Sequence, residues 1–184
     1  MDISTSFPKM TEIVKQQREL QSKLDKTFVS ELKAFIKDLP AISGIEWVQY
    51  TPYFNDGDPC TFCVYGVNVY LESGHEIVKN AILANPELKN KLCAHENYEE
   101  EEDEDQDEDS EVVEEKEPKE YFLEDSDWSI RGLTTPELQA VLDKAFALSS
   151  ILDNCQSTLE SKFGDGYRVR LSKTGITTED YSHD

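Results

Sequence analysis

The chain has 184 residues, a formal net charge of −21 and a hydrophobic fraction of only 38%. This length suits one domain with a single core, although the average composition is close to that of disordered proteins. The four cysteines occur without a secretory signal sequence, and no apolar run approaches the roughly 18 residues that a membrane-spanning helix needs. These features favour a reduced, cytoplasmic setting, with no membrane association and no secreted disulfide scaffold.

The negative charge is concentrated in one segment. Between Glu96 and Asp127 there are 19 acidic residues and two lysines, a net charge of −17, and the whole-chain value of −21 leaves −4 for the other 152 residues. We therefore expect residues 96–120 to be an acidic low-complexity insert. Residues 1–95 and 121–184 are expected to form a single α+β domain.

The first predicted element is a helix over residues 8–39. Its apolar residues recur at threes and fours, as in an amphipathic helix, and Pro40 ends the pattern. A helix of about 30 residues is roughly 45 Å long, which is longer than a compact domain of this size can cover. Part of it is expected to project or to pair with a second copy, and the candidate self-association residues are Ile13, Leu20, Leu24 and Phe28.

Next, the periodicity changes to two over residues 45–50 and again over residues 61–71, on either side of a turn-rich block at residues 55–59. This pattern predicts a β-hairpin. Strict alternation would place Cys63, Tyr65, Val67, Val69 and Leu71 on one face of the second strand. A helix is expected from about residue 76 to residue 93, interrupted at Pro86.

After the insert, Tyr121–Leu123 should anchor the chain on the folded body. Thr134 and Thr135 offer caps for a long helix that runs to about residue 163, and residues 167–171 alternate as a strand. Residues 177–184 read as a polar tail. The predicted fold is α+β: a long N-terminal helix, a β-hairpin, a helix, the insert, a long helix and a final strand, with a small, mostly antiparallel sheet packed by helices.

One group of residues resembles a metal site. Cys60 and Cys63 form a C-x-x-C pair, and with Cys93 and His95 they could offer four ligands to zinc. The second pair has the wrong spacing for a zinc knuckle, so reduced cysteines in a hairpin explain the pattern better. We expect no metal and no other cofactor.

The sequence shows no catalytic motif. The three histidines lie in polar contexts away from any recognised nucleophile arrangement, and the glycines are scattered rather than gathered in a phosphate-binding loop. We expect no enzymatic activity. Direct nucleic-acid binding is disfavoured because the few basic residues face a large excess of negative charge.

Two stretches carry a resemblance to known proteins. The run from Trp47 to Cys60, WVQYTPYFNDGDPC, and the run from Gly175 to Asp184, GITTEDYSHD, resemble small acidic proteins of tailed bacteriophages. The resemblance implies a bacterial host cytoplasm as the setting, where such proteins often block host nucleic-acid enzymes or defence systems. It implies no site residues, and the acidic insert is not part of it.

The charge distribution suggests the function. A dense carboxylate run can replace a phosphate backbone for a protein built to neutralise phosphates, so we expect a non-enzymatic inhibitor or decoy of a basic host protein, with electrostatics like those of a DNA mimic. The alternative is a structural or assembly protein that forms a homodimer through its first helix and uses the acidic loop as a solubilising spacer. The candidate partner-binding residues are Glu99, Glu100, Glu101, Glu102, Asp103, Glu104, Asp105, Asp107, Glu108 and Asp109.

Overall fold

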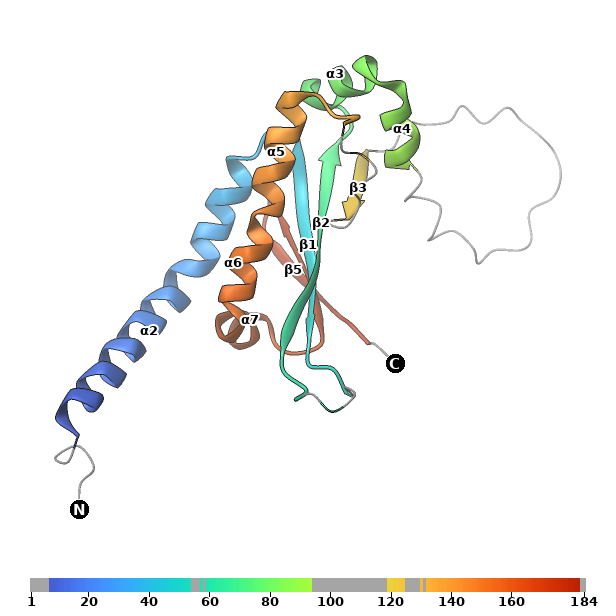
Figure 1. The fold of residues 1–184 in the computed structure, drawn as a ribbon. Helices are drawn as coiled ribbons and strands as arrows, with labels where there is room; N and C mark the ends of the chain where they lie inside the picture. Colours follow the sequence, from blue (N-terminus) through green and yellow to red (C-terminus); the bar gives the residue numbers. More distant parts are fainter. Residues whose placement is uncertain are drawn as a thin grey trace.

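The computed structural model describes residues 7–53, 57, 59–93, 119–124, 130 and 132–182. Within these residues the chain folds into a five-stranded sheet with helices packed against it (Figure 1). The helices are α2 (Pro8–Lys37), α3 (Glu76–Ala84), α4 (Pro86–Cys93), α5 (Pro136–Phe146), α6 (Leu148–Asn154) and α7 (Gln156–Phe163). The strands are β1 (Ile42–Tyr50), β2 (Cys63–Glu72), β3 (Glu120–Glu124), β4 (Tyr167–Ser172) and β5 (Ile176–Asp180).

The sheet has the strand order β3-β2-β1-β4-β5, and every neighbouring pair is antiparallel. β1 is the central strand: Trp47 pairs with Val67 on β2 and with Val169 on β4. All three residues are almost completely buried. The α+β class and the antiparallel sheet confirm the fold predicted from the sequence.

Helices cover one face of this sheet. α2 contacts β1 and β4, α5 and α6 contact β2, and α7 packs against α2 and α6 (Figure 1). The buried side chains of the sheet alternate toward these helices, because successive residues of a strand point to opposite faces. The opposite face, here called the outer face, carries partly exposed residues such as Val48, Tyr50 and Asn68. None of the described helices is both long and apolar enough to cross a membrane.

Three predicted boundaries differ from the structure. The long helix after the insert is divided into α5, α6 and α7. Its second break falls at Cys155, whose φ of −113° and ψ of 17° are not helical, and just before it the Asn154 side chain donates to the Ser150 carbonyl, competing with the backbone. The expected anchor after the insert is the strand β3, and much of the expected polar tail is the edge strand β5.

A β-bulge corrects the predicted faces of β2. Trp47 pairs with Val67 whereas Val48 pairs with Tyr65, so Gly66 is the additional residue, and its φ is +49°. Beyond the bulge the alternation is reversed. The prediction that Tyr65 and Val67 share a face is therefore wrong: Val67 is buried against the helices, whereas Tyr65 lies on the outer face, where it stacks on Tyr50.

Candidate interaction surfaces

The N-terminal part of α2 presents apolar side chains to solvent. Ile13 is 62% exposed, Leu20 is 65% exposed and Leu24 is 36% exposed. Phe28, which was predicted to lie in the same self-association surface, is only 4% exposed and belongs to the core. The apolar stripe of α2 is therefore divided: its C-terminal part packs on the sheet and its N-terminal part projects beyond the body (Figure 1).

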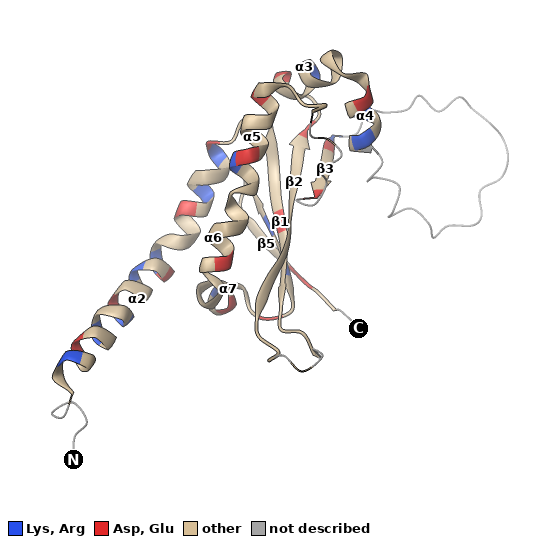
Figure 2. Ribbon diagram, in the orientation of Figure 1, with Lys and Arg blue, Asp and Glu red and all other residues tan. Residues whose placement is uncertain are grey.

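The point where α2 joins the body is marked by hydrogen bonds to α7. The Gln21 amide donates to Thr158 Oγ1 over 2.7 Å, and the Thr158 hydroxyl donates to Asp25 Oδ1 over 3.1 Å. Helix α2 has seven basic and four acidic residues, a net charge of +3 (Figure 2). In a chain of charge −21 this helix is a local basic element.

The ends of the acidic segment are fixed to the body. On the side before it, Leu88 and Leu92 of α4 are completely buried, and on the side after it, Tyr121 and Leu123 of β3 are buried in the same core. The Ser73 hydroxyl also donates to the Lys119 carbonyl over 3.0 Å. Because α4 contacts β3, both ends lie at one end of the sheet. The predicted partner-binding residues from Glu99 to Asp109 lie outside the described residues.

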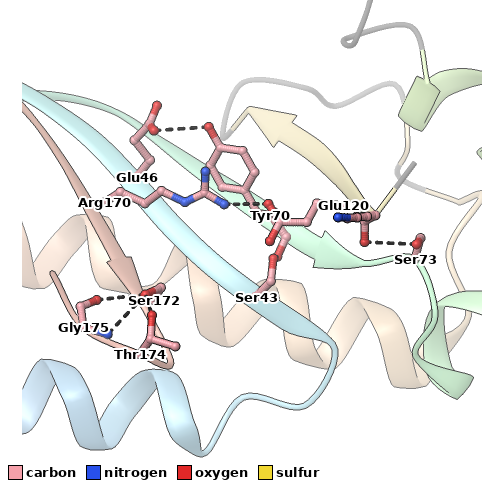
Figure 3. A network of polar contacts seen from close by, with 10 residues as sticks. Ser43, Glu46, Tyr70, Ser73, Glu120, Arg170, Ser172, Thr174 and Gly175 are labelled. Atoms are coloured by element: carbon pink, nitrogen blue, oxygen red, sulfur yellow. Dashed lines mark hydrogen bonds and ion pairs between the residues drawn. The ribbon is translucent and has the colours of Figure 1, made fainter. Parts of the chain in front are cut away.

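The outer face of the sheet carries a polar network that the sequence did not reveal (Figure 3). Tyr70 donates its hydroxyl to Glu46 Oε2 over 3.2 Å, and the Arg170 guanidinium lies 4.0 Å from the centroid of the Tyr70 ring. Arg170 also pairs with Glu120 on β3 over 2.5 Å. Arg168 Nε lies 3.7 Å from Glu46 Oε1. The network thus links β1, β2, β3 and β4.

The contacts of this network join neighbouring strands and are structural. Glu46 is only 8% exposed although it lies on the outer face, because tyrosine and arginine side chains surround its carboxylate. Burial, followed by the neighbouring Glu46 charge, raises the pKa of Tyr70 well above its usual value. A tyrosine that holds its proton so firmly is a hydrogen-bond donor rather than a base. The adjoining cavity of about 250 Å³ is lined by side chains of both signs, including Arg168 and Glu179.

A second group on the outer face is a row of three tyrosines, here called the tyrosine row: Tyr65, Tyr50 and Tyr181. The rings of Tyr65 and Tyr50 stack with centroids 4.2 Å apart, and those of Tyr50 and Tyr181 are 5.6 Å apart. Burial, together with Cys63 and Tyr50, raises the pKa of Tyr65 to about 12. Adjacent to Tyr50 and Tyr181 is a cavity of about 400 Å³ at the hairpin end of the sheet.

The structure describes only part of the candidate zinc site. Cys60 and Cys63 are free thiols at the start of β2, whereas Cys93 ends α4 near the other end of that strand. Leu71, near the end of β2 that lies beside β3 and α4, follows Cys63 by eight positions, roughly 25 Å along the strand at 3.3 Å per residue. Zinc ligands must lie within about 2.3 Å of the ion. The backbone of Cys93 therefore lies far along the sheet from Cys63, and the side chain of Cys93 and the whole of His95 lie outside the described residues. Within the part of the chain that the structure describes, no group of three metal-ligating side chains occurs.

The chain matches no protein-family model, no curated protein and no solved structure. The described residues form an α+β fold with a projecting amphipathic helix and an outer sheet face rich in tyrosine, and the strongly acidic segment of the sequence lies between α4 and β3 in the chain.

Proposed function

We propose that the protein is a non-enzymatic binding protein that inhibits or decoys a basic protein through its acidic segment. The observation that carries the proposal is the partition of charge: residues 96–127 hold a net −17 of the total −21. The partner would be a nucleic-acid-binding or defence enzyme of a bacterial host, met in the host cytoplasm, because such enzymes present basic surfaces to phosphate.

Two features of the body support this proposal. First, α4 and β3, which flank the segment in the chain, pack against each other on the folded body, so the segment leaves and rejoins the body at one end of the sheet. Second, the residues outside 96–127 carry only −4, and apart from Tyr121 and Leu123 of β3 they supply all the described buried apolar residues of the core. The body can therefore fold without the acidic segment, and the segment can be dedicated to attracting positive charge.

The test is a comparison of three full-length or near-full-length proteins in a bacterial lysate. One is the natural chain, one lacks residues 97–117, and one keeps its length but has the ten acidic residues from Glu99 to Asp109 replaced by their amides. We expect specific basic partners to bind the natural chain and to be lost from both variants. For a purified partner, the association rate should fall about 10- to 100-fold on neutralisation, because steering is electrostatic.

Salt provides the internal control for this experiment. Charges are screened beyond about 10 Å at 0.1 M ionic strength, so binding of the natural chain should weaken steeply with salt while the amide variant shows little change. If the same partners bind all three proteins with the same salt dependence, the proposal is refuted. A folded far-UV circular dichroism spectrum of each variant excludes unfolding as the cause.

A second candidate function, assembly as a homodimer, is favoured by the exposed stripe on α2. Met10, Ile13 and Leu20 are each more than 60% exposed, at spacings of three and seven residues that place them on one side of the helix. Lone exposed apolar residues need no explanation, but a stripe on a projecting helix is typical of a helix-pairing surface. In this reading the acidic segment keeps the assembly soluble.

Replacing Leu20 by Glu tests the homodimer. Ser22 lies on the opposite side of the helix and is also exposed, so Ser22→Glu adds the same charge without touching the stripe. We expect the natural chain and Ser22→Glu to sediment as dimers and Leu20→Glu as a monomer. The two chains of a dimer each carry a net charge of −21 and repel each other. Salt screens this repulsion, so dimerisation should strengthen with salt, whereas binding to a basic partner should weaken. A natural chain that is a monomer at tens of micromolar in high salt contradicts this candidate.

A further inference from the structure

The cavity beside the tyrosine row is built from aromatic rings and one carboxylate. Tyr50, Tyr53 and Tyr181 line it, together with Asp165 and the backbone around Gly166. Its volume is about 400 Å³, which is larger than a single side chain needs. Asp165 is the one charged residue among the described residues that line it, and Arg168 lies next to it, 5.9 Å from the centroid of the Tyr181 ring.

The walls of this cavity are held in place by several elements. The Thr51 amide donates to Asp165 Oδ1 over 2.7 Å, which joins the end of β1 to the loop before β4. The Gly166 amide donates to the Gln49 carbonyl over 3.1 Å, and the Tyr181 amide donates to the Gly166 carbonyl over 2.8 Å. These hydrogen bonds hold the Asp165 carboxylate and the backbone at Tyr181 against the end of β1 before any ligand arrives.

The same sheet face already pairs tyrosine rings with guanidinium groups. Arg170 lies 4.0 Å from the centroid of the Tyr70 ring, and Arg168 lies 5.9 Å from that of Tyr181. A cation within about 6 Å of an aromatic centroid is attracted by the negative potential of the ring face. These two pairs show that the geometry of the outer face suits planar cations on tyrosine.

We propose that this cavity is a binding site for a cationic side chain, an arginine or lysine of the partner protein, held between the Tyr53 ring and the Asp165 carboxylate. The proposal deepens the proposed function, on which it rests for the basic character of the partner. The acidic segment supplies long-range attraction, which is strong but unspecific, whereas the cavity accepts one residue in a defined place. Recognition would then combine electrostatic steering with an anchor residue in a pocket.

The test uses a short probe rather than an unknown partner. Acetyl-Gly-Arg-Gly-amide is titrated into the full-length chain labelled with nitrogen-15, and the amide signals of Thr51 and Gly166 are followed. The control is the same peptide with citrulline, which keeps the shape of arginine and lacks its charge. We expect saturable shifts at millimolar peptide and binding at least about fivefold weaker for citrulline.

Variants at Tyr53 and Asp165 separate the ring and charge contributions. Tyr53 is 88% exposed, so its replacement should not disturb the fold. Tyr53→Phe retains the ring and should retain binding, whereas Tyr53→Leu should weaken it about fivefold. Asp165→Asn keeps an oxygen for the Thr51 amide and removes the charge, so it should weaken arginine binding without changing citrulline binding.

The outcomes distinguish this proposal from the proposed function. Binding of arginine and citrulline peptides with equal affinity, or retention of full arginine binding by Tyr53→Leu, overturns the cavity proposal. If a hexathymidylate probe moves the same signals while the arginine peptide does not, the site stacks bases instead, which also overturns it. A partner that is lost on neutralising Glu99 to Asp109 but binds Tyr53→Leu unchanged supports the acidic segment and refutes the cavity.

Discussion

Replacing Trp47 by Ala should destabilise the protein by about 3–5 kcal/mol, the usual cost of removing a large aromatic side chain from a core. Trp47 is completely buried in the central strand, and its ring packs edge-to-face on Phe163 with centroids 6.1 Å apart. Its indole N–H donates to Gln49 Oε1 over 3.1 Å, and the Gln49 amide donates to the Gly164 carbonyl over 2.6 Å. The substitution therefore opens a cavity and also removes a donor from a buried polar chain.

The measurement for Trp47→Ala is urea denaturation followed by far-UV circular dichroism, since the substitution removes a fluorescent probe. A loss of this size is a large part of the 5–15 kcal/mol that ordinary domains possess. Val48→Ala is the matched control, because Val48 is the next residue of the same strand and lies on the outer face. Its cost should stay within about 1 kcal/mol. Equal losses for the two variants would show that the outer face contributes as much as the core.

Gly164→Ala should cost about 3 kcal/mol or more, from two independent causes. Gly164 has φ +88° and ψ −178°, a backbone conformation that is essentially restricted to glycine and costs other residues about 1–3 kcal/mol. In addition, a Cβ at this position would lie 2.7 Å from Cε2 of Tyr167, so the ring would have to move. Tyr167 packs against the core, which limits how far it can shift.

Gly66→Ala separates these two causes. Gly66 also has a positive φ, +49°, but no atom lies within 4 Å of the position that its Cβ would occupy. Only the conformational cost of about 1–2 kcal/mol is expected there. Urea denaturation of both variants should show the larger loss for Gly164→Ala. If Gly164→Ala lowers the free energy of unfolding no more than Gly66→Ala does, the Tyr167 ring moves aside at no measurable cost.

Several elements could be predicted from the sequence because their signals are local. The period of three and four from Met10 to Leu39 is enough to predict α2, and the alternation from residue 167 to residue 171 is enough for β4. The cap of α5 follows from Thr135 and Pro136, and the Thr135 hydroxyl does accept a hydrogen bond from the Leu138 amide over 3.3 Å. In each case the residues that decide the structure lie within a few positions of one another.

The edge strands could not be predicted because their residues do not carry a hydrophobic period of their own. β5, with the sequence ITTED, is mostly exposed, and what makes it a strand is pairing with β4, where Val169 opposes Thr178. β3 likewise depends on β2, which precedes it by some 50 residues, and Leu123 pairs with Val69 there. Strand pairing is a property of the partner as much as of the segment.

The sequence by itself determined the class of the fold, the projecting helix and the concentration of charge in one segment, since composition and periodicity are sums over neighbouring residues. Only the tertiary structure decided which apolar residues of α2 remain exposed: Leu24 and Phe28 share one stripe, yet Leu24 is 36% exposed and Phe28 only 4%. It also decided that Tyr65 faces outward, because the bulge at Gly66 reverses the alternation. The cavity beside the tyrosine row also follows from long-range packing. Tyr50 is more than 100 residues from Asp165 and Tyr181 in the chain, and the three residues meet only because β1 pairs with β4 and β4 pairs with β5.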